Sequence, residues 1–405
     1  GINEHLIRYA YEEGVDTILT CDNGIAAVEQ TKLAKSLGMT ILITDHHEVQ
    51  EEVPPADAVV NPRQADCPYP FKHLCGAAVA YKVICCLYEA YGIPKEETEE
   101  FLEFAGFATV GDVMDLIGEN RILVKEGLKR LNHTQNVGMA SLIRACGLEE
   151  KEIKSYHIGF VLGPCINAGG RLDTAKRSLN LLLQKDRAKA DVMAAELKTL
   201  NDERKDMTQT GAEEAIEWIE KEGRSQDKVL VVYLPDCHES LAGIIAGRIR
   251  ERYNKPVFVL TDSIDGVKGS GRSIEAYSMF EEMSKCKELY TKYGGHPMAA
   301  GLSLEEKDID EFRRRLNADA ELTEEDFVPK IWIDVPMPFE YVNEKIVQEL
   351  KDLEPFGQGN EKPLFAQKSL VIRNARVLGK NRNVVKLNLV TETGQPVDGL
   401  LFADG

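Results

Sequence analysis

Two groups of residues that can bind metal ions follow β-forming runs near the start of the chain. Asp22 comes directly after one run, and Asp45-His46-His47 directly follow the next. In parallel α/β sheets, ligands bind at the carboxyl ends of the strands. Carboxylate and imidazole donors there suit Mn²⁺, and a carboxylate can bridge two ions. A single Asp after a strand is more often a turn residue, whereas two adjacent histidines are less easily explained, because burying both without partners is costly.

A third carboxylate and two glycine-rich segments complete the residues with possible chemistry. Asp112 is unremarkable by itself, since apolar runs often contain a helix-terminal Asp. Residues 269–273 and 294–301 combine glycines with Ser, Arg or His. Glycine-rich turns let backbone N–H groups approach phosphate oxygens, and Arg offers them a planar fork. The alternative is that these glycines only serve tight turns.

The first hundred residues alternate strand and helix. Runs 16–21, 39–44 and 56–60 read as strands, and the segment after Asp22 has helical spacing up to Gly38. This order predicts a parallel α/β sheet. Helices are expected to dominate from Ala77 to about Leu148.

The rest of the chain predicts a long helix, a second α/β segment and a β-rich tail. The charged run 186–222 has helical periodicity and would connect two lobes. Several short strands then suggest a small barrel or sandwich, ending incomplete at Gly405. Strands are expected at 330–334, 369–372, 384–390 and 397–402. The expected domains are 1–185, the connecting helix 186–222, 223–318 and 319–405.

Composition is that of an ordinary soluble globular protein, with 43% hydrophobic and 29% charged residues. No apolar run of eighteen residues occurs, so no transmembrane helix is expected. The nine scattered cysteines read as reduced thiols of a cytoplasmic protein. A net charge of −18 argues against general coating by nucleic acid. Between residues 362 and 391, however, charged residues are all basic: Lys362, Lys368, Arg373, Arg376, Lys380, Arg382 and Lys386. This stretch is either a solvated sheet face or a DNA-binding surface.

Motifs along the whole chain resemble the DHH family of phosphoesterases and, within it, the RecJ branch of single-stranded DNA 5′-exonucleases. Cys21-Asp22-Asn23-Gly24, Asp45-His46-His47 and Gly111-Asp112-Val113 resemble motifs of the DHH domain. The segments that resemble the RecJ branch or the DHH-associated domain are 61–63, 74–80, 163–171, 238–248, 269–273, 294–301 and 353–360. The implied fold is a parallel-sheet DHH domain, a connecting helix, an α/β DHH-associated domain and an OB-like barrel.

The resemblance implies roles for the first-domain residues. Asp22 would bridge two Mn²⁺ ions, with Mg²⁺ as an alternative metal, and His46 and Asp112 would ligate one of them. His47 would lie beside the scissile phosphate, and Asp45 would orient the histidines. The implied reaction is two-metal hydrolysis of a phosphodiester bond.

The resemblance also implies contacts to DNA outside the metal site. Ser270, Arg272, Gly295 and His296 would hold the terminal phosphate, with Arg171 reaching from the first lobe. The barrel would contact the strand through the basic residues Lys368, Arg373, Arg376, Lys380 and Arg382.

One family motif has no counterpart. DHH enzymes carry Asp-x-Asp-x-x-Gly upstream of Asp22, and residues 1–21 contain no such sequence. Two explanations are a fragment of a longer enzyme, which the remaining metal ligands favour, and a scaffold that no longer catalyses. The chain as it stands is expected to bind Mn²⁺ weakly and to hydrolyse DNA poorly or not at all.

Three functions therefore stay open. The first is a 5′-to-3′ single-stranded DNA exonuclease of repair and recombination. The others are a non-catalytic single-strand-binding scaffold and a small DHH phosphodiesterase acting on short oligonucleotides. The resemblance implies a single-strand binding protein and a RecQ-type helicase as partners, and a cytoplasmic monomer is the default expectation.

Overall fold

The computed structural model describes residues 2–172, 174–264, 266–379 and 383–402, without the side chains of residues 171 and 172. The chain divides into two compact units. The first comprises residues 1–135, 148–163 and 332–405, and the second comprises 136–147 and 164–331. The units therefore interleave along the chain, whereas the expected boundaries were placed in linear order. Among the described residues, no helix combines the length and apolar character needed to cross a membrane.

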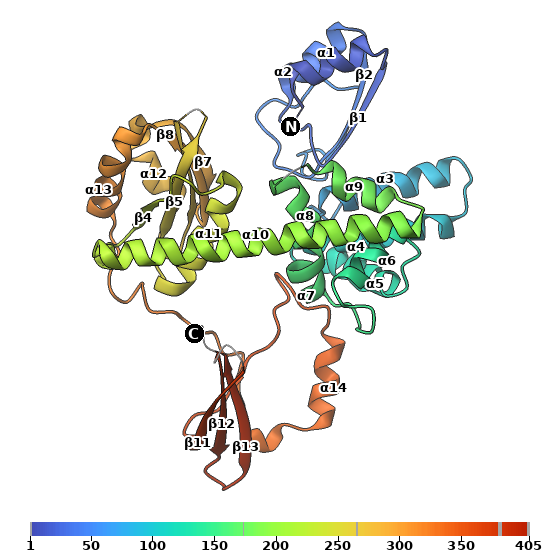
Figure 1. The fold of residues 1–405 in the computed structure, drawn as a ribbon. Coiled ribbons are helices and arrows are strands. Elements are labelled where there is room, and N and C mark those ends of the chain that lie inside the picture. Colours follow the sequence, from blue (N-terminus) through green and yellow to red (C-terminus); the bar gives the residue numbers. More distant parts are fainter. Residues whose placement is uncertain (1, 173, 265, 380–382, 403–405) are drawn as a thin grey trace. The chain divides into compact units, whose positions relative to one another are not determined.

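The first unit opens with a three-stranded parallel sheet in the order β1-β2-β3 (Figure 1). Its elements are α1 (Glu4–Glu12), β1 (Thr17–Cys21), α2 (Val28–Ser36), β2 (Thr40–Thr44) and β3 (Ala58–Val60). Ile41 and Ile43 point to one face of the sheet, because side chains alternate along a strand. There they pack with Ile7 of α1 and Ala34 of α2. This layer fixes the strand ends after which Asp22 and Asp45 follow.

A helical layer follows in the same unit. Its helices are α3 (Gly76–Ala90), α4 (Leu102–Gly111), α5 (Gly118–Leu131) and the short α7 (Ser155–His157). Helices α4 and α5 cross closely: a Cβ on Gly106 would lie 2.9 Å from the Leu123 carbonyl oxygen. Because no larger side chain fits at this crossing, α4 lies directly against α5 at Gly106, six residues before Asp112.

The C-terminal part of the first unit contains short strands and one helix, α14 (Glu344–Asp352). A two-stranded sheet pairs β9 (Val335–Pro336) with β10 (Phe365–Ala366). A three-stranded antiparallel sheet holds β11 (Val371–Leu378), β12 (Val384–Val390) and β13 (Pro396–Phe402). The strand expected at 330–334 is wrong: these residues are irregular and Trp332 is 79% exposed. Pairing with β10 begins only at Val335, preceded by one hydrogen bond from the Asp334 N–H to the Leu364 carbonyl, so among the described residues the apolar run before it is not paired as a strand.

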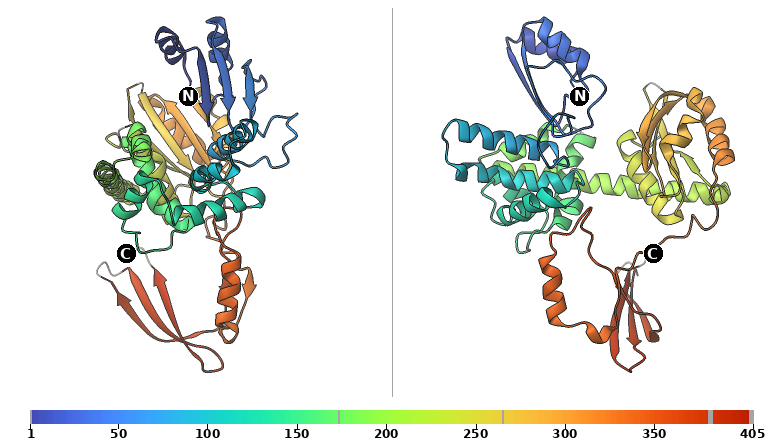
Figure 2. Two further views of the ribbon diagram at one scale, coloured as in Figure 1. Left: turned by 90° about the vertical axis from the view of Figure 1, so that its right-hand side faces the viewer. Right: turned by 180° about the vertical axis from the view of Figure 1, so that it is seen from behind.

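The second unit contains the long helix α10 (Arg187–Lys221) and a five-stranded sheet in the order β4-β5-β6-β8-β7 (Figure 2). Its strands are β4 (Leu230–Tyr233), β5 (Val257–Ser263), β6 (Gly266–Arg272), β7 (Tyr290–His296) and β8 (Ala299–Leu304). Helices α10 and α11 (Glu239–Tyr253) pack on one face, around Val257 and Val259. Helices α12 (Met279–Ser284) and α13 (Ile309–Asp319) pack on the other, around Phe258. The remaining helices of this unit are α6 (Val137–Ala145), most of α8 (Gly163–Leu172) and α9 (Lys176–Leu183).

Candidate metal centre and nucleic-acid interface

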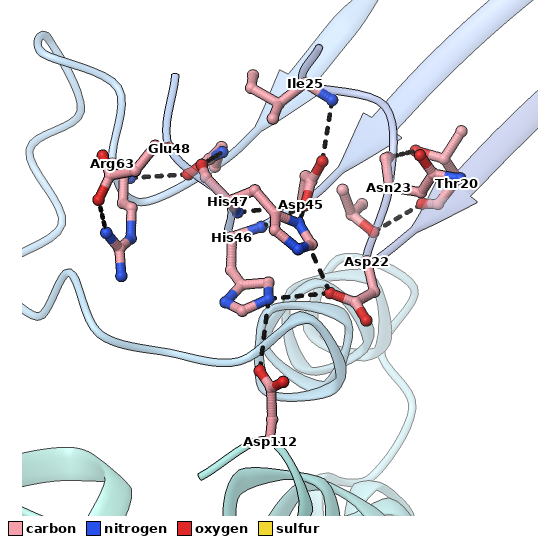
Figure 3. Close-up of polar contacts among 12 residues, drawn as sticks. Thr20, Asp22, Asn23, Ile25, Asp45, His46, His47, Glu48, Arg63 and Asp112 are labelled. Carbon is pink, nitrogen blue, oxygen red and sulfur yellow. Dashed lines mark hydrogen bonds and ion pairs between the residues drawn. The ribbon is translucent and has the colours of Figure 1, made fainter. Parts of the chain in front are cut away.

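Asp22 lies immediately after β1, in a turn that directs its side chain away from the strand (Figure 3). Its backbone N–H donates to the Thr44 carbonyl at 3.0 Å and extends the pairing of β1 with β2 by one residue. Its φ of 60° is left-handed, a conformation that Asp adopts more readily than most residues. The Thr20 hydroxyl donates to the Asn23 carbonyl at 2.5 Å and closes the turn. Local hydrogen bonds thus determine where this carboxylate points.

Gly76, the first residue of α3, lies directly against Asp22. A Cβ on Gly76 would be 2.4 Å from Asp22 Oδ1, so only glycine fits there. The start of a helix also favours a negative charge beside it. Gly76 lies in the segment 74–80 that resembles the RecJ branch, and no role was predicted for it. The signal in the sequence is a glycine directly before the helical stretch expected from Ala77.

Asp45 lies after β2 and holds the two histidines that follow. The side chain is 1% exposed. Oδ2 accepts from the Ile25 N–H at 2.9 Å, and Oδ1 accepts from the backbone N–H groups of His46 and His47 at 2.8 and 3.2 Å. Oδ1 also lies 2.7 Å from His47 Nδ1. Burial raises the pKa of the Asp45 carboxyl, but these hydrogen bonds outweigh burial and bring the pKa below its ordinary value.

His46 lies between the two carboxylates that the sequence placed ninety residues apart. Its Nε2 is 3.0 Å from Asp22 Oδ1 and 3.5 Å from Asp112 Oδ2 (Figure 3). Asp112 caps the end of α4, so strand ends and helical layer contribute to one cluster. The side chain of His46 is largely buried, and its Nδ1 has no hydrogen-bond partner among the described residues. The structure therefore brings together Asp22, Asp45, His46, His47 and Asp112, the five residues predicted for this site.

The donor set fits a divalent cation. Ligand atoms of Asp22, His46 and His47 all lie within 4.8 Å of one another. Burial raises the pKa of Asp112, and the nearby Asp22 carboxylate adds to that rise. The hydrogen bond to Asp45 raises the pKa of His47. A cation between the carboxylates of Asp22 and Asp112 would remove their mutual repulsion. Mixed oxygen and nitrogen donors suit Mn²⁺.

In the second unit, cross-strand register places the predicted phosphate contacts on one sheet face. Arg272 of β6 pairs with Ala299 of β8, which pairs with His296 of β7. Ser270 lies two residues before Arg272 and therefore faces the same side. A Cβ on Gly243 of α11 would lie 2.7 Å from Ser270 Oγ and 2.8 Å from Arg272 Nη2, so both side chains lie over this glycine.

Gly295, another predicted contact in this unit, is required by close packing. A Cβ there would be 2.5 Å from the Ala299 carbonyl oxygen. A groove of about 430 Å³ borders this face and is lined by Ser270, Lys268 and Lys292, among others. The role of Gly295 and of the surrounding residues in binding phosphate stays a prediction.

The predicted basic residues of the tail are only partly described. Lys368, Arg373 and Arg376 are exposed, the two arginines on β11. Lys380 and Arg382 lie outside the described residues, and so does the side chain of Arg171. Arg376 lies opposite Lys386 of β12. Lys386 also contacts Asp398 of β13 at 2.8 Å, so the purely basic stretch of sequence is partly neutralised in the fold.

Comparison with protein families and known proteins agrees with this architecture. The DHH family N-terminal domain matches residues 2–111, the DHHA1 domain matches 226–321 and the RecJ OB domain matches 333–405. The chain is 38% identical to the single-stranded-DNA-specific exonuclease RecJ of Bacillus subtilis, over 98% of this chain and 50% of that protein. It is 33% identical to the Escherichia coli protein of the same name, over 99% of this chain and 73% of the relative.

Solved structures give the same result. The crystal structure of Thermus thermophilus RecJ in complex with Mn²⁺ matches all of this chain with a TM-score of 0.86 and 31% identity. The chain covers 59% of that structure, and it spans half the length of the B. subtilis relative. A second structure of Thermus RecJ, with Mg²⁺, has a TM-score of 0.76 and 27% identity. Because all three domain types are matched and relatives align over almost its whole length, this chain belongs to the RecJ family of DHH proteins.

Proposed function

We propose that this chain belongs to an exonuclease that removes nucleotides from the 5′ end of single-stranded DNA with the help of Mn²⁺. The observation that carries the proposal is the cluster of Asp22, His46 and Asp112, with His46 Nε2 between two carboxylates. RecJ relatives are named single-stranded-DNA-specific exonucleases, and Thermus RecJ was crystallised with Mn²⁺ or Mg²⁺. Mn²⁺ is the metal that we propose here, with two ions in the complete site and Mg²⁺ as the alternative.

The clustered residues of the first unit have different proposed roles. Asp22, His46 and Asp112 would hold the cations. Bound divalent ions activate a water and stabilise the oxygens of an in-line phosphoryl displacement. Asp45 keeps His47 Nδ1 occupied at 2.7 Å, which leaves Nε2 to contact an oxygen of the scissile phosphate. Because Asp45 also binds both backbone N–H groups, the two imidazoles are oriented before substrate arrives.

The second unit would bind the terminal phosphate. Ser270, Arg272 and His296 share one sheet face, and Gly243 lets the first two approach α11. With Gly295 and Arg171 they form the proposed anchor that selects a 5′ end. Lys368, Arg373, Arg376, Lys380 and Arg382 would contact the strand farther along.

The location, the oligomeric state and the protein partners are further proposals. A cytoplasmic location and a monomeric state fit an enzyme of DNA repair and recombination. A single-strand binding protein and a RecQ-type helicase are proposed partners on the basis of the family alone. The smaller DHH phosphodiesterases, which usually lack a barrel, are disfavoured by the RecJ OB domain at 333–405.

The test is release of nucleotides from single-stranded DNA with Mn²⁺. It uses the 405-residue chain and the same chain joined to the upstream segment of the B. subtilis relative, because residues 1–21 contain no Asp-x-Asp sequence. We expect slow release or none from the chain alone, rapid release from the joined protein and none from its Asp22→Asn variant. A 5′ phosphate should speed release, and Arg272→Ala should remove that advantage.

Mn²⁺ binding is measured in parallel by electron paramagnetic resonance. Binding of DNA without release by either protein would support the non-catalytic scaffold instead. Faster cleavage of oligonucleotides a few nucleotides long than of long strands would support a small phosphodiesterase. Rapid release by the 405-residue chain alone would show that it needs no further carboxylates.

A further inference from the structure

The turn that follows Asp112 has a conformation that its sequence does not favour. Helix α4 ends in a Schellman motif, in which the Val113 N–H donates to the Val110 carbonyl at 3.1 Å and the Met114 N–H donates to that of Thr109 at 3.1 Å. This motif requires a left-handed residue, usually glycine. Here that residue is Val113, with a φ of 55°. A β-branched side chain in this region strains the backbone, so neighbouring structure must hold the turn.

Burial of Val113 does not provide this support, because the side chain is 67% exposed. The support comes at Asp115 and Leu116, two and three residues after Val113, where another segment of the first unit packs against them. The Leu116 N–H donates to the Gln358 carbonyl at 2.7 Å, and the Leu116 side chain is 1% exposed. A Cβ on Gly357 would be 2.7 Å from Leu116 Cδ1, and one on Gly359 would be 3.0 Å from Asp115 Cβ. Residues 357–360, called here the 357–360 turn, therefore pack closely on the segment after Asp112.

The 357–360 turn is itself well held. Gly357 and Asn360 exchange two backbone hydrogen bonds, at 3.0 and 3.1 Å. The Asn360 side chain donates to the carbonyls of Leu353 and Pro355, each at 2.9 Å. Residues 353–360 are thereby tied to one another at the tip of the long loop that follows α14 (Figure 1).

Two helices of the helical layer fix the residues just before this turn. Lys154, at the start of α7, places its Nζ 2.9 and 3.0 Å from the two carboxylate oxygens of Glu354. Arg121 of α5 donates from Nη2 to the carbonyls of Asp352 and Glu354, at 3.0 and 3.2 Å. The turn is therefore anchored to the layer that also carries α4.

We propose that the 357–360 turn is a positioning element for Asp112. The turn holds residues 115 and 116, these residues keep Val113 in its strained conformation, and that conformation aims the Asp112 carboxylate at His46 Nε2, 3.5 Å away. A turn within the residues that match the RecJ OB domain thus supports a proposed metal ligand that lies just beyond the end of the DHH match. The inference rests on the proposed metal-dependent function, but the contacts within the turn can be tested separately.

The test compares two glycines that both have positive φ. Gly359, with φ 69°, contacts Asp115, whereas Gly394, with φ 89° in the β12–β13 turn, has nothing within 4 Å of its would-be Cβ. Alanine at either position strains the backbone, but only Gly359→Ala displaces the segment after Asp112. We expect about ten-fold weaker Mn²⁺ binding for Gly359→Ala, typical of losing a group that orients a metal ligand. Gly394→Ala should bind Mn²⁺ like the unchanged chain.

A second variant and a second measurement complete the design. Gln358→Ala should bind Mn²⁺ normally, since Gln358 contributes its backbone carbonyl. Hydrogen–deuterium exchange should accelerate in residues 112–117 for Gly359→Ala and not for Gly394→Ala. Equal exchange and equal Mn²⁺ affinity in those two variants would overturn the proposal. If the unchanged chain binds no measurable Mn²⁺, the proposed function is in doubt, and exchange still tests whether the turn holds this segment.

Discussion

At the scale of single residues, the proposed metal site depends on a glycine as much as on its proposed ligands. Asp22 lies against the start of α3, and a side chain on Gly76 would occupy the position of its carboxylate. We expect Gly76→Ala to turn Asp22 away from His46 and to weaken Mn²⁺ binding about 10- to 100-fold. Titration followed by electron paramagnetic resonance measures this loss.

The control for Gly76→Ala is a glycine that is equally crowded but lies in the second unit. A Cβ on Gly138 of α6 would be 1.9 Å from the Leu181 carbonyl oxygen. Gly138→Ala should lower stability without changing Mn²⁺ affinity. If both variants lose stability and neither loses Mn²⁺ affinity, Gly76 has only a packing role.

At the scale of elements, helix α4 contains a buried carboxyl group that serves no evident chemistry. Glu103 is 6% exposed and accepts one hydrogen bond from the Thr134 hydroxyl, at 2.9 Å. Burial raises the pKa of Glu103 above its ordinary value of 4.5, and the bond from Thr134 offsets this only in part. A carboxyl whose pKa is higher in the folded state destabilises the protein at neutral pH, and this cost disappears once the group is protonated in both states.

We therefore expect Glu103→Gln to stabilise the first unit at pH 7, by on the order of 1 kcal/mol. The advantage should shrink as the pH falls through the raised pKa of folded Glu103 towards the ordinary value of 4.5, and it should be absent below 4.5, where both states of the unchanged chain are protonated. Urea unfolding at several pH values, monitored by the hydrogen-exchange protection of α4, measures the difference in the free energy of unfolding between the two chains. An advantage that is constant with pH would show that the carboxyl is not the cause.

At the scale of the whole molecule, a net charge of −18 makes DNA binding depend on where the basic residues lie. Arg373 and Arg376 are exposed on β11, whereas Lys386 is paired with Asp398 at 2.8 Å. The salt dependence of single-strand binding is the slope of log K against log salt concentration, and each phosphate contact contributes about 0.7 to its magnitude. We therefore expect replacement of both arginines by Gln to lower the magnitude of this slope by about 1.4. Titration of a labelled oligonucleotide in Ca²⁺ at several salt concentrations gives the slope.

Lys386→Gln is the matched control for the two arginines. It removes one positive charge from the same sheet, but from a residue that already has a carboxylate partner. The slope should change less than for either arginine alone. Equal effects from all three residues would mean that net charge, and not the position of the arginines, governs binding.

The sequence by itself determined the elements and side chains that depend on near neighbours. β-forming runs that end in Asp22 and in Asp45-His46-His47 predicted a parallel sheet with these side chains at its edge, and the structure has this arrangement. The long helix at 186–222 was readable from its periodicity and runs from Arg187 to Lys221. Such features follow from hydrogen bonds and side-chain spacing within a few residues, so the order of residues suffices to find them.

Only the tertiary structure decided which distant segments meet. Asp112 reaches His46 because α4 is held by its close crossing with α5, and Gly76 matters because α3 begins against Asp22. The 357–360 turn likewise supports Asp112 from a segment that is remote in the sequence. Lys386 pairs with Asp398, which lies on a separate strand. The wrong strand at 330–334 has the same origin, since a β-forming run becomes a strand only where a partner lies beside it. Contacts of this kind depend on how the layers pack, which residue spacing along the chain does not contain.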